Sequence, residues 1–385
     1  MRRPSLVSLL LTLALAACEG APPDDQAVYD AMPRLSLSPV VEICAGSEDV
    51  QCQFVNAMLV TAAPDGRVAV ADMMGELREF DREGRFVRTV GARGGGPGEY
   101  RRLVAAGYDE QGRLTVLDQA AMRVQRFDTA GAVSDATTAP MIPGLMGVSV
   151  VGGQVALFAL PGATAVGDSV EVHVVLVDPS TGDTTSLPGL PEPAMATGDG
   201  SVFAMPPLFT VMPLERWGVS PDGALLLADG ERLRIVRRGA GDEAPRVLVD
   251  LGAAPYPVTA GELEAEKARR LEEATRMGGG SPTLQRTLDE AAASAPKTHP
   301  FVSRLVVLDD GTVFAREGVR PGADSVRWNA FTADGDPVGH LLLPADARIA
   351  SGRFERLLVV TAGEHDVPRI IWFAVEGGAT PSRKG

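Results

Sequence analysis

The sequence has few residues that bind metals and few that carry positive charge. It contains only three cysteines and four histidines among 385 residues, and 36 lysines and arginines stand against 50 aspartates and glutamates. The histidines, His173, His299, His340 and His365, do not have the spacing of metal ligands. We therefore predict no metal site and no other cofactor.

The resulting net charge of −14 argues against two classes of partner. Nucleic acids and anionic lipid surfaces attract basic patches, and no basic run interrupts the acidic composition. We expect no binding to nucleic acid, and we expect contact with a membrane through an anchor only.

The first residues indicate export. Arg2 and Arg3 precede an almost unbroken apolar run over 6–17. This run is shorter than the roughly 20 residues that a membrane-spanning helix needs, so residues 1–17 are predicted to be a secretory signal peptide.

The end of this run resembles the lipobox of bacterial lipoproteins. Leu15-Ala16-Ala17-Cys18 consists of a branched residue, two small residues and a cysteine. The resemblance implies cleavage before Cys18 and acylation of that cysteine, with palmitate expected; ordinary cleavage after Ala16 would leave a spare thiol. Glu19 favours the outer membrane, by resemblance to lipoprotein sorting in diderm bacteria, while the leaflet and side stay open.

The polar, proline-containing residues after Cys18 have too few large apolar side chains to fold. Residues 18–33 are therefore predicted to be a lipidated tether.

Cys44 and Cys52 are predicted to form a disulfide. They lie eight residues apart in a polar loop that contains glycine, and export makes oxidation permissible. The alternative, a metal site, would need more cysteines or histidines nearby, and the closest histidine in sequence is His173.

Four segments read alike, each with a turn followed by an aliphatic strand. They begin at Asp65-Gly66, Gln111-Gly112, Asp222-Gly223 and Asp310-Gly311. The glycine supplies the positive φ of a hairpin turn, and the run after it suits a strand covered on both faces. Repetition at this scale indicates a repeat architecture that is mainly β.

In the first two copies a second strand ends in Phe80-Asp81 and Phe127-Asp128, and in the first copy a third strand leads into Gly94-Gly95-Gly96-Pro97-Gly98. In this order of elements the chain resembles NHL-type β-propellers and, more broadly, the six-bladed propeller lipoproteins of bacteria. That resemblance implies an all-β disc and an exported protein; most members of the group have no assigned function.

We predict a six-bladed β-propeller over residues 34–377, followed by a disordered tail of residues 378–385. The blades are placed near 54–100, 102–140, 145–190, 212–252, 302–344 and 347–376. The last is short of strands, and the alternating segment 34–43 is free to complete it and close the ring. Poor patterning between Pro188 and Pro213 also accommodates a seventh blade.

A small helical insertion, at about 255–299, interrupts the strands between the fourth and fifth blades. Thr259 and Glu262 form a capping box, helix-forming residues continue to Met277, and Gly278-Gly279-Gly280 stops the helix. A second helix is predicted over 283–293.

The first helix has a narrow apolar stripe, made of Ala260, Leu263, Leu271, Ala274 and Met277. We expect this stripe to rest on the disc, so that the charged side covers a pocket or meets a partner. The alternative is a solvated excursion without a role.

Asp72, Asp118 and Asp229 recur at equivalent strand ends and would form a ring of carboxylates if they converged. The structural interpretation is favoured, because an aspartate at such a position accepts backbone N–H groups of the adjoining turn.

The loop over 91–100, with Arg93, Arg101 and Arg102, is a candidate ligand-binding site for an anion held by backbone amides. No helix follows it, however, and the propeller resemblance explains it as a connection between blades.

The sequence supports no Ser-His-Asp set, and no catalytic residue is assigned. The favoured function is an envelope-anchored binding or scaffold module for a partner protein or small ligand. The alternative is a hydrolase or lyase with carboxylates or a divalent cation in the central channel. Carboxylates or histidines converging within about 4 to 6 Å at the channel mouth would indicate an enzyme, whereas an apolar channel would indicate a scaffold.

Overall fold

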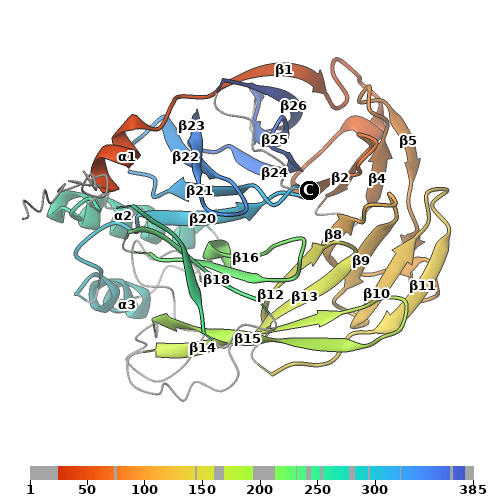
Figure 1. Cartoon of the computed structure of the whole chain (residues 1–385), viewed down its shortest axis with the longest axis horizontal. Coiled ribbons are helices and arrows are strands. Elements are labelled where there is room, and N and C mark those ends of the chain that lie inside the picture. The colour runs from red at the N-terminus through yellow and green to blue at the C-terminus, as the bar shows by residue number, and fades with distance from the viewer. Residues whose placement is uncertain are drawn as a thin grey trace, which may run out of the picture.

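The computed structural model of the chain is a ring of six four-stranded antiparallel sheets, the blades of a β-propeller (Figure 1). It confirms six blades rather than seven. The structure describes residues 25–72, 76–143, 145–159, 169–193, 213–230, 232–239, 244–251, 255–276, 282–293, 295–320, 322–364 and 367–377.

The first three blades follow one another along the chain, and the first strand of each is innermost. Blade 1 comprises β2 (Ala57–Ala62), β3 (Val68–Asp72), β4 (Leu77–Phe80) and β5 (Phe86–Thr89). Blade 2 comprises β8 (Leu103–Tyr108), β9 (Leu114–Asp118), β10 (Arg123–Phe127) and β11 (Val133–Thr138). Blade 3 comprises β12 (Leu145–Val151), β13 (Gln154–Ala159), β14 (Ser169–Val177) and β15 (Thr184–Pro193).

Blades 4 and 5 repeat this order. Blade 4 comprises β16 (Trp217–Val219), β17 (Leu225–Ala228), β18 (Leu233–Arg238) and β19 (Arg246–Leu251). Blade 5 comprises β20 (Val302–Val307), β21 (Val313–Glu317), β22 (Ser325–Phe331) and β23 (Pro337–Pro344). Between blades lie the short helices η1 (Val50–Cys52) and η2 (Pro213–Arg216) and a small parallel pair, β6 (Ala92–Arg93) and β7 (Glu99–Tyr100).

Blade 6 is built from both ends of the described chain. It comprises β24 (Arg348–Arg353), β25 (Arg356–Ala362), β26 (Pro368–Glu376) and β1 (Ser36–Glu42). Strand β1 pairs with β26 from Ser36 opposite Glu376 to Glu42 opposite Ile371. The predicted strand therefore does complete the sixth blade, as its outermost strand, and joins the two ends of the ring.

The antiparallel order gives the disc two faces. The turns from first to second strand lie on one face, which we call the hairpin face. Connections between blades lie on the other, which we call the interblade face. The repeated glycines of the predicted turns have positive φ, between 72° and 92°, at Gly66, Gly112, Gly223 and Gly311. Because side chains other than glycine rarely adopt this conformation, these turns explain the recurrence of glycine.

The core lies in the seams between neighbouring blades. Phe80, Phe127, Phe314 and Trp328 are at most 1% exposed, and each belongs to a cluster that draws residues from two blades. Each blade is therefore apolar on both faces, which explains why the sequence shows short aliphatic runs rather than strict alternation.

The end of the predicted tether is folded, which corrects the range 18–33. Residues Asp25–Ala31 form helix α1, and Met32 after it is buried in the seam of blades 4 and 5. The hydroxyl of Tyr29 donates to Glu317 Oε1 at 2.6 Å, and its ring meets that of Phe301 edge-on at 6.1 Å. Tyr29 and Met32, which follow the polar stretch after Cys18, thus fasten the end of this segment to the disc.

Several predictions fall outside the described residues. They are the signal peptide 1–17, the lipidated Cys18, the first part of the tether up to residue 24, the glycines 278–280 and the tail 378–385. Among the residues that are described, no helix has both the length and the apolar character needed to cross a membrane.

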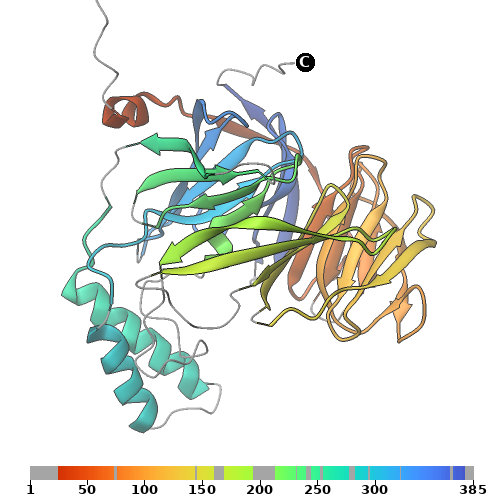
Figure 2. The same ribbon diagram turned by 60° about the horizontal axis from the view of Figure 1, so that its bottom comes forward.

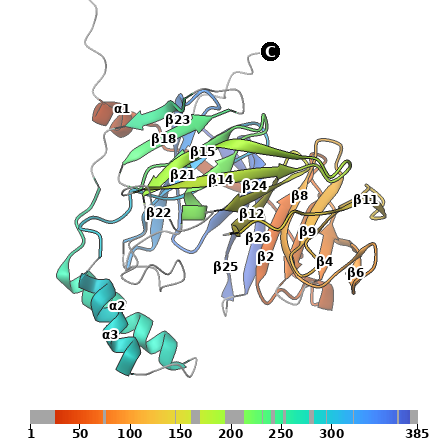
Figure 3. The same cartoon turned by 90° about the horizontal axis from the view of Figure 1, so that it is seen from below.

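The helical insertion is confirmed as α2 (Ala260–Arg276) and α3 (Pro282–Ala293), between blades 4 and 5. The two helices lie side by side and project from the disc (Figures 2 and 3). The capping box forms as predicted: the Thr259 N–H donates to Glu262 Oε2 at 2.8 Å, and the Glu262 N–H donates to Thr259 Oγ1 at 3.2 Å.

The apolar stripe of α2 packs differently from the prediction. Leu263 and Leu271 are half-buried and share a face with Lys267, which forms an ion pair of 2.8 Å with Asp289 of α3. The stripe therefore meets the second helix rather than the disc, because two short amphipathic helices bury more apolar surface against each other.

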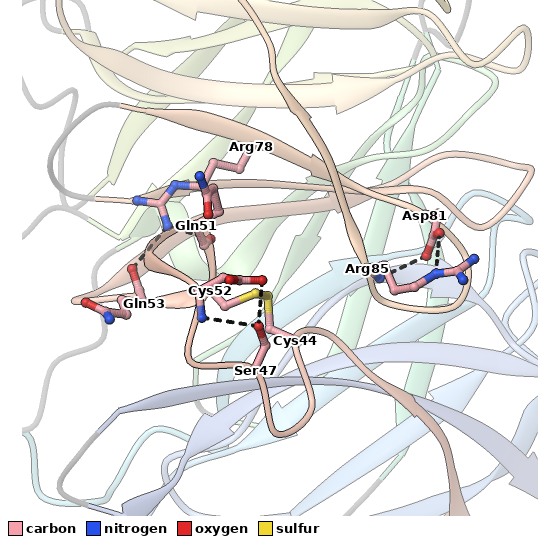
Figure 4. Close-up of a disulfide and its surroundings, with 9 residues drawn as sticks. Cys44, Ser47, Gln51, Cys52, Gln53, Arg78, Asp81 and Arg85 are labelled. Atoms are coloured by element: carbon pink, nitrogen blue, oxygen red, sulfur yellow. Dashed lines mark hydrogen bonds and ion pairs between the residues drawn. A yellow bond between two sulfur atoms is a disulfide. The ribbon is translucent and has the colours of Figure 1, made fainter.

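The Cys44–Cys52 disulfide is confirmed, with the two Cα atoms 5.5 Å apart. Figure 4 shows how Arg78 of β4 fastens this loop to blade 1: its guanidinium donates to Gln51 O at 2.9 Å and to Gln53 O at 3.1 Å. The bridge and the arginine together fix the chain where it enters the first blade.

Candidate functional site: the central channel

The innermost strands of all six blades enclose a central channel with a cavity of about 630 Å³. Its wall is made largely of small and aliphatic residues, among them Leu59, Val104, Val148, Val306 and Ile349. A volume of this size lies within the range of small-molecule sites, roughly 300 to 1,000 Å³. The strands thus form a preformed concave site.

Polar groups gather at the mouth of the channel on the hairpin face, where Asp109, Asp309 and Arg353 border the cavity. The Asp109 carboxylate is occupied by its own turn: it accepts from the Gln111 N–H at 3.0 Å and from Arg113 Nε at 2.7 Å. Asp109 therefore has a structural role.

Asp309 is open to water in the channel mouth, yet protein surrounds it on most sides. Burial, opposed by the charge of Arg353 and assisted by that of Asp310, raises the pKa of its carboxyl to about 6. The group changes charge close to neutral pH.

The mouth does not have the arrangement expected of a metal-dependent enzyme. Asp109 and Asp309 come from blades 2 and 5, three blades apart in a ring of six and therefore on opposite sides. Across the part of the chain that the structure covers, no three or more His, Cys, Asp or Glu side chains come together in a way that could hold a metal ion.

The histidines are also dispersed. His299 is buried beside Glu262, with Nε2 3.4 Å from a carboxylate oxygen, and His340 Nδ1 lies 3.1 Å from Met32 O at the rim. His173 is in β14, and His365 lies outside the described residues.

The interblade end of the channel carries a group of arginines that we call the arginine cluster: Arg304, Arg316 and Arg348. Arg304 and Arg348 directly precede the channel-lining residues Leu305 and Ile349 on the inner strands of blades 5 and 6. The cluster therefore stands where the apolar channel ends.

Each arginine of the cluster is held in place by an oxygen. Arg304 Nη2 lies 2.6 Å from Glu215 Oε1 of η2. Arg316 donates to Ser303 Oγ at 3.0 Å and to Ala345 O at 2.6 Å, and its guanidinium lies 5.9 Å from the centre of the Trp328 ring.

Arg348 reaches across the seam between blades 6 and 1 and donates to Ala57 O. Blades 1, 4, 5 and 6 thus all contribute to this end of the channel.

Positive charge exceeds negative charge in the cluster. The register of β20 and β21 places Arg304 directly opposite Arg316. Burial lowers the pKa of Arg348 to about 10, with the nearby Arg304 charge as the second cause, and the same two effects lower the pKa of Arg316. Within the described residues, Glu215 is the only carboxylate that forms an ion pair with the cluster.

The recurring aspartates have the structural role that the sequence favoured. Asp72 accepts the backbone N–H groups of Val55 and Asn56, at 2.9 and 2.8 Å. Asp118 accepts those of Arg101 and Arg102, at 3.2 and 3.0 Å. Each carboxylate fastens the chain segment that enters its own blade, so repetition of the blade explains the pattern.

The amides of the glycine-rich loop are already bonded within the protein. The Gly94 N–H donates to Tyr100 O at 3.1 Å, the Gly96 N–H to Glu99 Oε2 at 2.7 Å, and the Gly98 N–H to Gln125 Oε1 at 2.8 Å. The Glu99 carboxylate takes the position that an anion would need.

Arg93, Arg101 and Arg102 are all exposed in this connection between blades 1 and 2. The structure brings none of them to the channel lining.

Sequence reasoning missed the arginine cluster. Its members belong to two blades and are up to 44 positions apart, so no local motif contains them. A usable signal existed in the repeat itself: Arg304 and Arg348 each stand directly before the aliphatic part of an inner strand, and aligning the blades would have placed both at one end of the channel.

Comparisons with known proteins agree with this architecture. The sequence profile of a family described as a 6-bladed beta-propeller matches residues 50–151, which contain blades 1 and 2. No curated protein matches the chain in sequence.

Among solved structures, the chain is similar to a candidate exported protein from Bacteroides fragilis, with a TM-score of 0.53 and 13% identity over 92% of this chain and 97% of that one. It is also similar to a member of the duf4221 family from Bacteroides vulgatus, with a TM-score of 0.54 and 9% identity over 90% and 99%. At these identities the likeness concerns the fold, and the chain is a six-bladed β-propeller.

Proposed function

We propose that the protein is an exported binding propeller, anchored in the outer membrane by a lipid on Cys18, that holds a small ligand in its central channel. The observation that carries this proposal is the cavity of about 630 Å³, which is lined largely by small and aliphatic residues and has charged groups at its mouth on the hairpin face. Sites for small molecules have this composition, because apolar walls provide affinity and a few polar groups fix the orientation.

The cavity favours a small ligand over catalysis. The carboxylates at the hairpin face, Asp109 and Glu110 of blade 2 and Asp309 of blade 5, stand on opposite sides of the mouth, and Asp109 is bonded to its own turn. A hydrolase or lyase would need such groups to converge on one reacting atom.

Export is supported by independent features. The apolar leader and the Leu15-Ala16-Ala17-Cys18 sequence are those of a bacterial lipoprotein, and the Cys44–Cys52 disulfide suits an oxidising compartment. One of the structurally similar proteins is itself a candidate exported protein.

Site-specific photocrosslinking in the native cell tests the channel. A photoreactive residue in place of Ala350, which lines the cavity, should give a discrete small-molecule adduct on the purified protein by mass spectrometry. The matched control places the same residue at Val87, an exposed position on the outer strand of blade 1. Adducts that are absent at position 350, or identical at both positions, would overturn the proposal.

The anchor is tested by Cys18→Ser. We expect the variant to lose metabolic labelling with palmitate and to leave the membrane fraction, because the acylated sulfur is gone. Cys44→Ser serves as control and should still be labelled. Normal labelling of the Cys18→Ser protein would contradict lipid anchoring.

A further inference from the structure

The arginine cluster carries a surplus of positive charge in a protein whose net charge is −14. Its three guanidinium groups have one ion-pair partner, Glu215, in the described structure. At the seam of blades 1 and 2, by contrast, the Glu79 carboxylate pairs with both of the partly buried arginines Arg67 and Arg88.

The arrangement is unfavourable for the protein alone. Arg304 and Arg316 stand directly opposite each other on β20 and β21, and like charges in that relation destabilise a sheet. Taking guanidinium groups out of water adds to this, because carbonyl and hydroxyl oxygens compensate a charge only in part. A bound negative group would relieve both effects.

We infer that the arginine cluster binds the oxyanion group, a carboxylate, sulfate or phosphate, of the ligand that occupies the central channel. This inference rests on the proposed function and names the chemical class of its ligand. The guanidinium group suits that class, since its planar set of N–H donors matches two oxygens of an oxyanion at once. The apolar channel wall then takes the rest of the molecule.

Glu215 acts as an internal substitute for the ligand. Its carboxylate binds Arg304 at 2.6 Å from η2, the short helix that leads into the inner strand of blade 4. An incoming oxyanion competes with Glu215 for the same guanidinium. Glu215 therefore weakens anion binding while it keeps Arg304 in place.

The altered pKa values agree with this geometry. Burial and, second, the neighbouring positive charge of Arg304 together lower the pKa of Arg348 to about 10. Arg348 still carries its charge at neutral pH, and among the described residues no carboxylate forms an ion pair with it.

Isothermal titration of the full mature protein in detergent tests the inference. Sodium sulfate, sodium phosphate and sodium acetate are each titrated at constant ionic strength, with sodium chloride as the reference. We expect saturable binding of at least one oxyanion at millimolar concentrations or below, with chloride not binding. The oxyanion that binds most tightly identifies the group. If none binds saturably, the inference is overturned.

Variants separate binding from folding. Arg304→Gln and Arg348→Gln should each raise the Kd by about tenfold or more, since a charge-assisted hydrogen bond is removed. Glu215→Gln should lower the Kd, because the competing carboxylate is lost; a folding defect would not tighten binding. Arg369→Gln, which breaks an exposed pair with Glu42 on the rim, should leave the Kd unchanged. Equal affinity in all four variants would refute the assignment.

The two proposals fail in different ways. A small-molecule adduct at position 350, together with no oxyanion binding, would reject the cluster as the ligand site and leave the binding channel standing. Absence of both would reject the binding propeller itself.

Discussion

The seam between blades 1 and 2 and the arginine cluster both bury arginines, but they balance the charge differently. At the seam, Glu79 is 2% exposed and pairs with Arg67 and Arg88, while Arg67 also pairs with Asp65 at 2.8 Å. Two arginines there meet two carboxylates. In the described structure the cluster has three arginines and one paired carboxylate, Glu215.

The balanced network holds two blades together. Tyr108 of blade 2 donates to Glu79 Oε1 at 2.9 Å, and Arg67 donates to Gly112 O of the same blade at 3.1 Å. Arg88 adds a bond of 2.7 Å to Thr129 O. A partly buried ionic group whose charges cancel is explained by its contribution to stability. A surplus of one sign is not explained in this way, and for that reason we propose a ligand-binding role for the cluster.

The largest expected effect lies at the seam. Glu79→Ala should lower the free energy of unfolding by about 3 to 5 kcal/mol, because it removes the counter-charge of Arg88 and leaves Arg67 with the exposed Asp65 alone. Urea denaturation followed by circular dichroism measures the loss. Glu83→Ala removes an exposed carboxylate that pairs with Arg82 and should change stability by less than about 1 kcal/mol. Similar losses in the two variants would contradict a structural role for the Glu79 network.

The Cys44–Cys52 disulfide is a second feature that stabilises the region of blade 1. Replacing Cys44 and Cys52 together by serine should cost about 2 to 3 kcal/mol, since the bridge restricts the unfolded chain over a short loop. The same urea assay on the double variant, with the parent protein in dithiothreitol for comparison, measures it. If the urea midpoint is unchanged both in the double variant and in the reduced parent protein, the Arg78 contacts alone fix the loop.

At the cluster the expected effect on stability is much smaller. Arg348→Gln should change the free energy of unfolding by about 1 kcal/mol or less in either direction, because the lost bond to Ala57 O is offset by the removal of a buried like charge. Denaturation without added oxyanion measures it. A loss of unfolding free energy as large as that of Glu79→Ala would show that the cluster, like the Glu79 network, stabilises the fold.

The smallest expected effect concerns Asp309 at the opposite mouth. The pKa of Asp309 in the folded protein, about 6, lies above the usual value of 3.8. Protonation of Asp309 therefore stabilises the folded protein relative to the unfolded chain, and this contribution is fully present below about pH 4. This contribution is lost as pH rises through about 6. Asp309→Asn should therefore gain less than about 1 kcal/mol at pH 7, since the group is open to water, and nothing at pH 4. Thermal unfolding at both pH values measures the difference. A gain of the same size at pH 4 would rule out titration of Asp309 as its cause.

Much of the fold could be predicted because its signals are local. The capping box of Thr259 and Glu262 predicted the start of α2, and the Asp-Gly turns located the blades. Strand β1 was predicted from its alternation and from the missing strand of blade 6. Helix α1 was not, because its short apolar face is stable only against the seam of blades 4 and 5.

The candidate site could be predicted only in outline. A six-bladed ring implies a central channel, but whether its wall is apolar depends on the twist of each blade and on how the inner strands meet. The roles of Asp72 and Asp118 were predictable, since repetition of a residue at one place in a repeated unit indicates a role in that unit. Arg93, Arg101 and Arg102 were a candidate anion-binding site because they are close in sequence, yet they lie outside the channel.

The sequence by itself determined the repeated turns and strands, the closing strand, the capped helix and the disulfide pair. Each of these features depends on residues within one turn or strand, or on the number of strands or cysteines that the sequence contains. Only the tertiary structure decided which charges meet. Arg304 and Arg348 are 44 positions apart, and Glu215 lies in η2, ahead of blade 4, so the ring alone brings them together. Electrostatic interaction depends on distance in space and on burial, and neither can be read from positions along the chain.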